Sequence, residues 1–401
     1  MGRLNTETGF FKWTKGTPFN YATSIASSWI WAPAIFISAQ QAYTNGLSGF
    51  LMFFLPNLFT LIFFAYVASY VRNRCEGYTV MDALNNTNKQ QKAIHLLAYT
   101  LIVLCSCCTQ IIGMQILLLP FVNSKALIAV AISLVCLALV WKGGLKSSII
   151  TDTYKYIVMF ICAVVLLLNT NGEVSFVGTT TMTVGEIFTS FGMIAGLGLL
   201  SGVYSDMTLW QRAFSIPKEN VKNYFIQSGM YFAVIPLIFG IIGFTCANSG
   251  LDWTLSDQFN SGILSIVLIV CVTATLMATL DSNLCAAAAI PCKVFGKSLV
   301  AGRVAMTLVL VIACILTSIE AISLTYMFLV YNTVRVCIAI PTLLIIFNKF
   351  DMKRLFMATL AGVLIAPIGY AITTNYLFTL FGFLVPLFGI KINKLQKEND
   401  V

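Results

Sequence analysis

Residues 277–282 read Met-Ala-Thr-Leu-Asp-Ser and lie inside a long apolar segment, residues 263–290. An isolated charge at membrane depth costs several kcal/mol, so Asp281 needs a cationic partner inside the protein. Three hydroxyl residues follow helical spacing around it, which places their oxygen atoms along one helix face: Thr275, Thr279 and Ser282. Oxygen ligands of this kind suit a hard cation such as Na⁺. The stretch therefore predicts a cation site within a membrane-spanning helix.

The composition is that of an integral membrane protein. Of 401 residues, 58% are hydrophobic and only 10% are charged, and the mean hydropathy is +0.87, which ordinary soluble proteins do not show. Each apolar run is long enough to cross a bilayer at about 20 residues per helix. The runs predict twelve spans: residues 21–44, 47–71, 93–119, 126–141, 148–169, 186–205, 222–246, 261–291, 299–319, 322–347, 355–373 and 375–390.

The distribution of positive charge predicts the topology. Of the 24 Lys and Arg residues, only Lys125 and Arg335 lie outside the N-terminus, the connections after even-numbered spans and the C-terminal tail. Three residues in the first part of their spans are grouped with the connection before that span: Lys155, Lys222 and Arg303. By the positive-inside rule, both termini are cytoplasmic in a multi-pass protein of the plasma or inner membrane. The net charge of +9 thus reflects topology, so we expect the lipid bilayer, and no nucleic acid, as a partner.

Motifs for catalysis and metal binding are missing from the sequence. His95 is the single histidine, and most of the cysteines fall within apolar runs, where packing roles are expected. Neither Gly-x-Ser-x-Gly nor His-Glu-x-x-His occurs. We therefore expect neither an enzyme nor a resident cofactor.

Two predicted spans carry residues that interrupt helices. Pro33 has no N–H for the carbonyl of Trp29 and clashes with it, so the first span is expected to open near residues 26–29. The sixth span contains four glycines, which either weaken the helix or allow close helix packing: Gly192, Gly196, Gly198 and Gly202. The two spans are five apart, and such an odd offset is typical of inverted repeats, whose interrupted helices form a transporter's midplane site.

Four motifs in chain order over residues 20–350 resemble the sodium:solute symporter family. They are Trp29-Ile30-Trp31-Ala32-Pro33, Gly143-Gly144-Leu145-Lys146 followed by Thr151-Asp152-Thr153, Ser205-Asp206 followed by Trp210-Gln211-Arg212, and Met277–Ser282. The first helix is most similar to the branches that carry urea and small polar solutes. The resemblance implies an all-α, five-plus-five inverted-repeat fold of the leucine-transporter type, with broken helices one and six. Residues 1–350 would form this core, with ten spans over 21–347, and residues 351–401 would add two spans and a cytoplasmic tail.

The resemblance also implies where the coupling ions bind. Thr279 supplies a hydroxyl to the main sodium site, and the carbonyls of Thr23, Ala26 and Thr275 complete it. Asp152 and Asp281, with Ser282 beside them, flank a second sodium site, where two close carboxylates should share a cation or a proton. Two features depart from the family: no helix precedes the first broken one, and Ala278 replaces a serine that commonly binds sodium. The Ala278 departure favours a weakened site or H⁺ as the coupling ion, but Na⁺ remains the favoured ion.

Five further residues in the predicted spans have two interpretations each. Gln40, Gln110 and Gln115 either line a solute cavity or hydrogen-bond neighbouring helices. Trp29 and Trp31 are either cavity walls or packing residues. All five are candidates for binding the solute.

Three further charged residues lie within or close to predicted spans. Asp206 and Arg212 are expected to pair as a gate or structural bridge at the cytoplasmic end of span six. Arg335 lies 14 residues before Lys349, roughly 21 Å along a helix, so it cannot reach the membrane surface. It pairs with Asp281, binds a carboxylate on the solute, or is solvated by carbonyls and water.

The sequence therefore predicts a secondary active transporter. It would couple a cation to symport of a small polar or anionic organic solute by alternating access. The alternative is an uncoupled channel or facilitator for urea or a similar solute, which the same fold could form with degraded ion sites. The sequence leaves the solute and the oligomeric state open.

Overall fold

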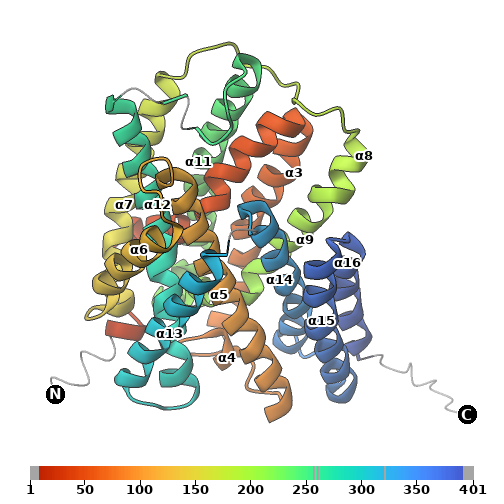
Figure 1. Ribbon diagram of the computed structural model, residues 1–401. Coiled ribbons are helices and arrows are strands. Elements are labelled where there is room, and N and C mark those ends of the chain that lie inside the picture. Colours follow the sequence, from red (N-terminus) through yellow and green to blue (C-terminus); the bar gives the residue numbers. More distant parts are fainter. Residues whose placement is uncertain (1–8, 256–257, 260–261, 320–321, 392–401) are drawn as a thin grey trace, which may run out of the picture.

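The computed structural model describes residues 9–255, 258–259, 262–319 and 322–391, and these form a bundle of helices (Figure 1). The helices are α2 (Pro18–Trp29), α3 (Ala32–Arg72), α4 (Val80–Ala83), α5 (Lys89–Leu118), α6 (Lys125–Val140), α7 (Gly144–Leu168), α8 (Val184–Ile187), α9 (Met193–Gly202), α10 (Met207–Ser215), α11 (Val221–Ser249), α12 (Gly262–Ala289), α13 (Leu299–Thr317), α14 (Leu324–Ile346), α15 (Met352–Thr373) and α16 (Tyr376–Leu384). The predicted all-α membrane architecture is confirmed.

The expected spans correspond to these helices. Nine helical segments of the described chain are long and apolar enough to cross a membrane, and two more apolar helices, Lys125–Val140 and Tyr376–Gly389, are shorter. Helix α3 contains the second half of the expected span 21–44 and the whole of the expected span 47–71. A sharp bend at Gly46, where φ is +60°, separates the two. A side chain at Gly46 would also collide with the backbone of Phe176 and Gly178, so this bend requires glycine.

The first break lies slightly later than expected. Helix α2 continues through Trp29, and the Ile30 N–H still donates to the Ala26 carbonyl at 2.8 Å. The backbone is extended at Ile30 and Trp31, and α3 begins at Ala32. Pro33 therefore occupies the first turn of α3, where its missing N–H costs little, and the chain opens immediately before that turn.

The second break follows the glycine-rich helix. Helix α9 ends at Gly202, a short 3₁₀ turn covers Val203–Ser205, and Asp206 is extended before α10 begins. The glycines at 198 and 202 have a packing role as well, because a Cβ at either would collide with the side chain of Asn332 or Arg335 on α14. The break and the close packing are therefore both present.

The two breaks lie in the interior of the bundle. Helix α2 packs on α7, α11 and α12, while α9 packs on α3 and α14. Helices α15 and α16 lie side by side at one edge, next to α14 (Figure 1). Helices α2, α3, α5, α9, α10, α12 and α14 thus supply the side chains and free backbone groups at the centre.

Candidate functional site

A small buried cavity lies where the two breaks meet. Its walls come from α2, the first break, α5, the second break with α10, α12 and α14. The lining residues are Ser28, Trp29, Trp31, Ser106, Asp206, Thr208, Thr279, Asn283, Tyr331 and Arg335. The cavity volume is about 10 Å³, close to the space that one water molecule needs. We call this set of residues the central cavity.

Arg335 is the main charged group of the central cavity. Its side chain is fully buried, and its guanidinium carbon lies 4.7 Å from the ring centre of Trp29, 5.5 Å from that of Trp31 and 4.6 Å from that of Tyr331. These distances allow cation–π attraction with all three rings. Tyr331 stands one helical turn before Arg335, so the i, i+4 spacing could have indicated this contact from the sequence.

The acidic partner of Arg335 is Asp206. Its Nη2 lies 3.5 Å from Asp206 Oδ2, which corrects the expected pairing with Asp281. The other Asp206 oxygen caps α10, accepting from the Thr208 N–H at 2.8 Å and the Thr208 hydroxyl at 2.6 Å. The cap orients Asp206 toward the start of α10, while Arg212 stands in the last turn of that helix. The expected pairing of Asp206 with Arg212 is therefore also corrected.

Thr279 reaches the carbonyls that the first break exposes. Its hydroxyl lies 3.1 Å from the Ile30 carbonyl oxygen, 3.3 Å from that of Ser28 and 3.4 Å from that of Ser27. Four oxygen atoms thus converge without a full negative charge. Hard oxygen ligands of this type fit Na⁺ better than a transition metal, and Thr279 also lines the central cavity.

The carbonyl set near Thr279 differs from the expected one. The Ala26 carbonyl accepts the Ile30 N–H, so it still belongs to α2. The Thr23 and Thr275 carbonyls lie inside α2 and α12, where helical hydrogen bonding uses them. The helix opens after Trp29, which is why the carbonyls facing Thr279 come from residues 27, 28 and 30.

Four buried charges form a second group, which we call the charged cluster: Asp152, Lys155, Arg212 and Asp281. Lys155 pairs with Asp281, and its Nζ lies 3.4 Å from Asp152 Oδ1. Arg212 Nη2 lies 2.9 Å from Asp152 Oδ2. Both carboxylates and the Arg212 side chain are fully buried, and the Lys155 side chain is 12% exposed. Two positive groups thus balance two negative ones.

Hydroxyl groups complete the charged cluster. Arg212 donates to Ser24 at 2.9 Å and to Ser282 at 2.7 Å, and Ser148 donates to Asp281 at 2.9 Å. Ser282 therefore belongs to this cluster and lies apart from the carbonyls around Thr279. Sequence reasoning missed Lys155, which lies within α7 and not in a connection. Its i, i+3 spacing from Asp152 was the available signal.

The three glutamines have different positions. Gln110 accepts the Ala32 N–H at 2.9 Å and so caps the start of α3. Gln40 accepts from Thr325 at 2.7 Å, and Gln115 donates to the Lys125 and Thr317 carbonyls. Gln40 and Gln115 therefore bond neighbouring segments, yet they also line a larger pocket.

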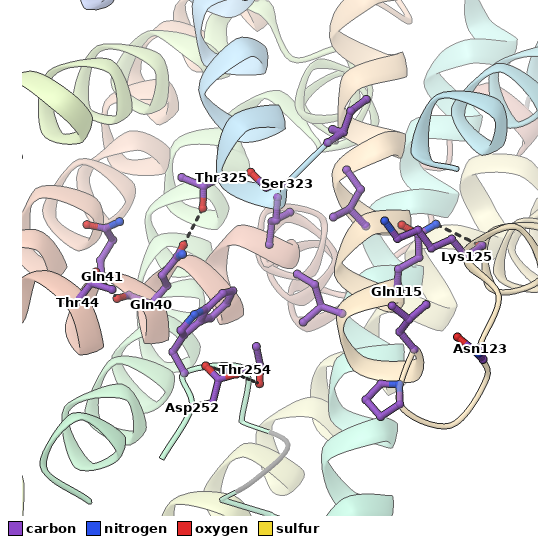
Figure 2. A pocket seen from close by; sticks show the side chains of 17 residues that line it. Gln40, Gln41, Thr44, Gln115, Asn123, Lys125, Asp252, Thr254, Ser323 and Thr325 are labelled. Atoms are coloured by element: carbon purple, nitrogen blue, oxygen red, sulfur yellow. Dashed lines mark hydrogen bonds between the residues drawn. The ribbon is translucent and has the colours of Figure 1, made fainter. Parts of the chain in front are cut away.

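That larger pocket, the vestibule, has a volume of about 850 Å³. Figure 2 shows Gln40, Gln41 and Thr44 of α3 on one side, with Gln115 of α5 and Lys125 at the start of α6 on the other. Its remaining walls include the segment after α11 and the start of α14. Gln40 stands ten residues after Ile30, roughly 15 Å along a helix, so the vestibule lies on the α3 side of the first break.

Comparison with known proteins supports the fold assignment. No protein-family model and no curated protein matches the sequence. The structure is similar to a substrate-bound, outward-open Na⁺-coupled sialic acid symporter, with a TM-score of 0.73 and 15% identity over 97% of this chain and 92% of that one. It is also similar to MHP1, a nucleobase-cation-symport-1 family transporter in a closed conformation with bromovinylhydantoin bound, with a TM-score of 0.62 and 14% identity over 95% of this chain and 92% of that one. The protein has the leucine-transporter-type fold of these transporters.

Proposed function

Starting from this transporter fold, we propose that the protein is a secondary active transporter that couples a cation, with Na⁺ favoured, to symport of a small polar or anionic organic solute. The observation that carries the proposal is the position of Thr279. Its hydroxyl faces three exposed carbonyls of the first break and also forms part of the central cavity wall. The cavity has space for about one water molecule here, so a solute would enter it only when its walls open. A cation at the carbonyls and an anionic solute would then be neighbours, and each would favour binding of the other.

The vestibule and the charged cluster lie on opposite sides of the first break, and this arrangement supports transport by alternating access. The vestibule provides a wide space on the α3 side of the first break. On the α2 side, Ser24 of the charged cluster stands six residues before Ile30, about 9 Å along the helix. The cluster thus closes the route on that side through buried ion pairs. By the positive-inside rule, the closed side faces the cytoplasm and the vestibule faces outward.

The composition of the charged cluster favours a single coupling ion. Lys155 lies between the two carboxylates that were expected to hold a second sodium. An ammonium group there supplies the charge that a second Na⁺ would bring, so we assign one coupling cation, at Thr279. Sodium activation of uptake should then follow a hyperbolic curve, whereas a sigmoidal curve would indicate a second site.

Uptake into proteoliposomes tests the proposal. Solute uptake is measured with an inward Na⁺ gradient, with K⁺ in its place, and with an inward proton gradient. We expect accumulation above equilibrium only with Na⁺. Thr279→Val removes the hydroxyl at nearly constant volume and should raise the sodium concentration for half-maximal uptake at least tenfold, as expected for one lost ligand.

The matched control is Thr317→Val. Among the described residues, the buried Thr317 hydroxyl donates only within its own helix, to Ala313 at 2.8 Å and to Cys314. The sodium dependence of this variant should therefore equal that of the wild type. Accumulation driven by the proton gradient alone would replace Na⁺ by H⁺. Equal uptake with and without any gradient would identify an uncoupled facilitator instead of a symporter.

A further inference from the structure

Arg335 has N–H groups without acceptors. Among the described residues, its Nε and Nη1 are buried and make no hydrogen bond. Since Nε carries one hydrogen and Nη1 carries two, three of the five guanidinium donors lack an acceptor. The indole nitrogens of Trp29 and Trp31, which line the same cavity, are also buried and unpaired.

Within the part of the chain that the structure describes, no acceptor meets these Arg335 donors. The contact of Arg335 with Asp206 is long, at 3.5 Å, and the other Asp206 oxygen already accepts three hydrogen bonds at the start of α10. Asp206 is thus stabilised largely by α10, and the charge of Arg335 is only partly offset. A single water accepts at most two hydrogen bonds, and the cavity has space for about one.

Position also indicates a binding role for this guanidinium. It passes Gly202 of α9 so closely that a Cβ there would collide with it. The gap left by this glycine lets an Arg on α14 reach the second break, where Asp206 is extended. Thr279 borders the same cavity, so a cation held by Thr279 would add positive charge close to Arg335.

We propose that the solute is a small monocarboxylate, and that its carboxylate binds Arg335 between Trp29 and Trp31. This inference rests on the proposed function and names the chemical class of its solute. A carboxylate only accepts hydrogen bonds and has about four lone-pair sites, which matches the surplus donors around Arg335. The cavity has space for about one water molecule in this structure, so the solute would bind when the walls around Arg335 open. The planar guanidinium suits carboxylate recognition. The aromatic rings around it favour a short apolar or flat remainder on the solute.

Carboxylates and their primary amides provide the test, because the members of each pair have nearly the same shape and differ in charge. The probes are acetate and acetamide, lactate and lactamide, and benzoate and benzamide. Binding to the purified full-length protein in sodium buffer is measured as a rise in Tm, and binding to the native state stabilises it by mass action. In the wild type we expect at least one carboxylate to bind roughly 100-fold more tightly than its amide.

Arg335→Gln should remove that preference. Arg303→Gln is the matched control, because Arg303 also lies over an indole ring, 5.3 Å from the ring centre of Trp141, but on α13 away from the cavity. The control should keep the wild-type preference. If Arg335→Gln does not fold, two gentler variants take its place: Arg335→Lys, which loses the planar fork, and Trp29→Phe, which loses one N–H. Both should weaken carboxylate binding about tenfold and leave amide binding unchanged.

The inference is overturned if no carboxylate of the panel binds, if amides bind as tightly, or if the Arg335 variants keep the wild-type preference. Its failure is distinct from failure of the proposed function. Sodium stabilisation that depends on Thr279, without a carboxylate preference, would leave symport standing and reject this solute class. A carboxylate preference at Arg335 without any coupling ion would retain the solute class and reject symport.

Discussion

The central cavity and the charged cluster both contain buried charged side chains, but they differ in how completely these side chains are paired and hydrogen-bonded. In the charged cluster, two carboxylates meet two cations and three serine hydroxyls. In the central cavity, Arg335 makes one long ion pair with Asp206, and its Nε and Nη1 have no hydrogen-bond acceptor among the described residues. Burial alone therefore does not distinguish a structural ion pair from a binding group. The completeness of the local hydrogen bonding does, because unmet donors favour a ligand.

Helix α2 connects the two regions. Ser24 and Ser27 contact the charged cluster, with Ser27 donating to the Asp152 carbonyl at 3.2 Å, and Trp29 borders the central cavity. Because α2 is a short helix that ends at the break, it can move as a unit. In the proposed mechanism, a ligand in the central cavity would shift α2 and thereby affect the ion pairs of the charged cluster. Alternating access needs such a coupling between the two regions.

The largest expected effect comes from removing a cation from the charged cluster. Arg212→Gln leaves Asp152 buried beside Lys155 alone and should lower the free energy of unfolding by about 3–5 kcal/mol. Arg335→Gln should cost about 1 kcal/mol, because it removes cation–π attraction but also removes a buried charge that Asp206 offsets only partly. Thermal unfolding of both variants measures the difference. Equal losses would remove the distinction between the two regions.

A double-mutant cycle tests whether Lys155 and Asp281 act as a pair. Lys155→Met and Asp281→Asn each leave one buried charge less well compensated, whereas the double variant removes both. We expect the double variant to be more stable than the sum of the single losses predicts, by about 1–3 kcal/mol. Thermal unfolding of the wild type, the two single variants and the double variant supplies the four-state comparison. Additive losses would show that the contact contributes no coupling energy.

Two glycines of α9 test whether the position of Arg335 requires a residue without a side chain. Gly202→Ala places a methyl group against the Arg335 guanidinium and should destabilise the protein by about 1–3 kcal/mol. Gly196→Ala is the matched control, because the nearest atom to a Cβ there is Pro56 Cγ at 3.8 Å. The control should be neutral or stabilising by up to about 1 kcal/mol. A similar loss for both would mean that general helix packing, not the Arg335 position, requires glycine.

The smallest effect is expected at an exposed ion-pair group around Glu76, between α3 and α4. Partial burial acts to raise the pKa of Glu76, but hydrogen bonds from Lys218 and Lys12 and the charge of Arg72 lower it to about 2. The ordinary glutamate pKa is about 4.3. The stabilisation is therefore present above about pH 4.3 and is lost as the pH falls toward 2.

Because the Glu76 side chain is 58% exposed, the loss should be at most about 0.5 kcal/mol. Thermal unfolding of the wild type and Glu76→Gln between pH 6 and pH 2 measures it. The two proteins should differ at the high end of this range and converge at the low end. A difference that grows toward low pH would reverse the sign of this prediction.

Much of the fold was predictable because its signals are local. The apolar runs give the spans through the cost of polar groups in lipid. Pro33 predicts the first break to within a few residues. A proline is tolerated in the first turn of a helix, so a new helix, α3, begins just before Pro33 and α2 must end before it. The positions of Arg335, Thr279 and Asp281 within spans likewise required partners before any partner was known.

The sequence alone determined that this chain is a polytopic helical membrane protein with an interrupted first helix and buried charges that need partners. Only the tertiary structure decided which partner each charge has. Arg335 meets Asp206 from 129 residues away, Lys155 meets Asp281 from 126, and Arg212 meets Asp152 from 60. Several buried acids were available to each cation, and the choice among them depends on how helices distant in sequence pack. Coulomb attraction strengthens as the distance in space shortens and does not depend on sequence separation.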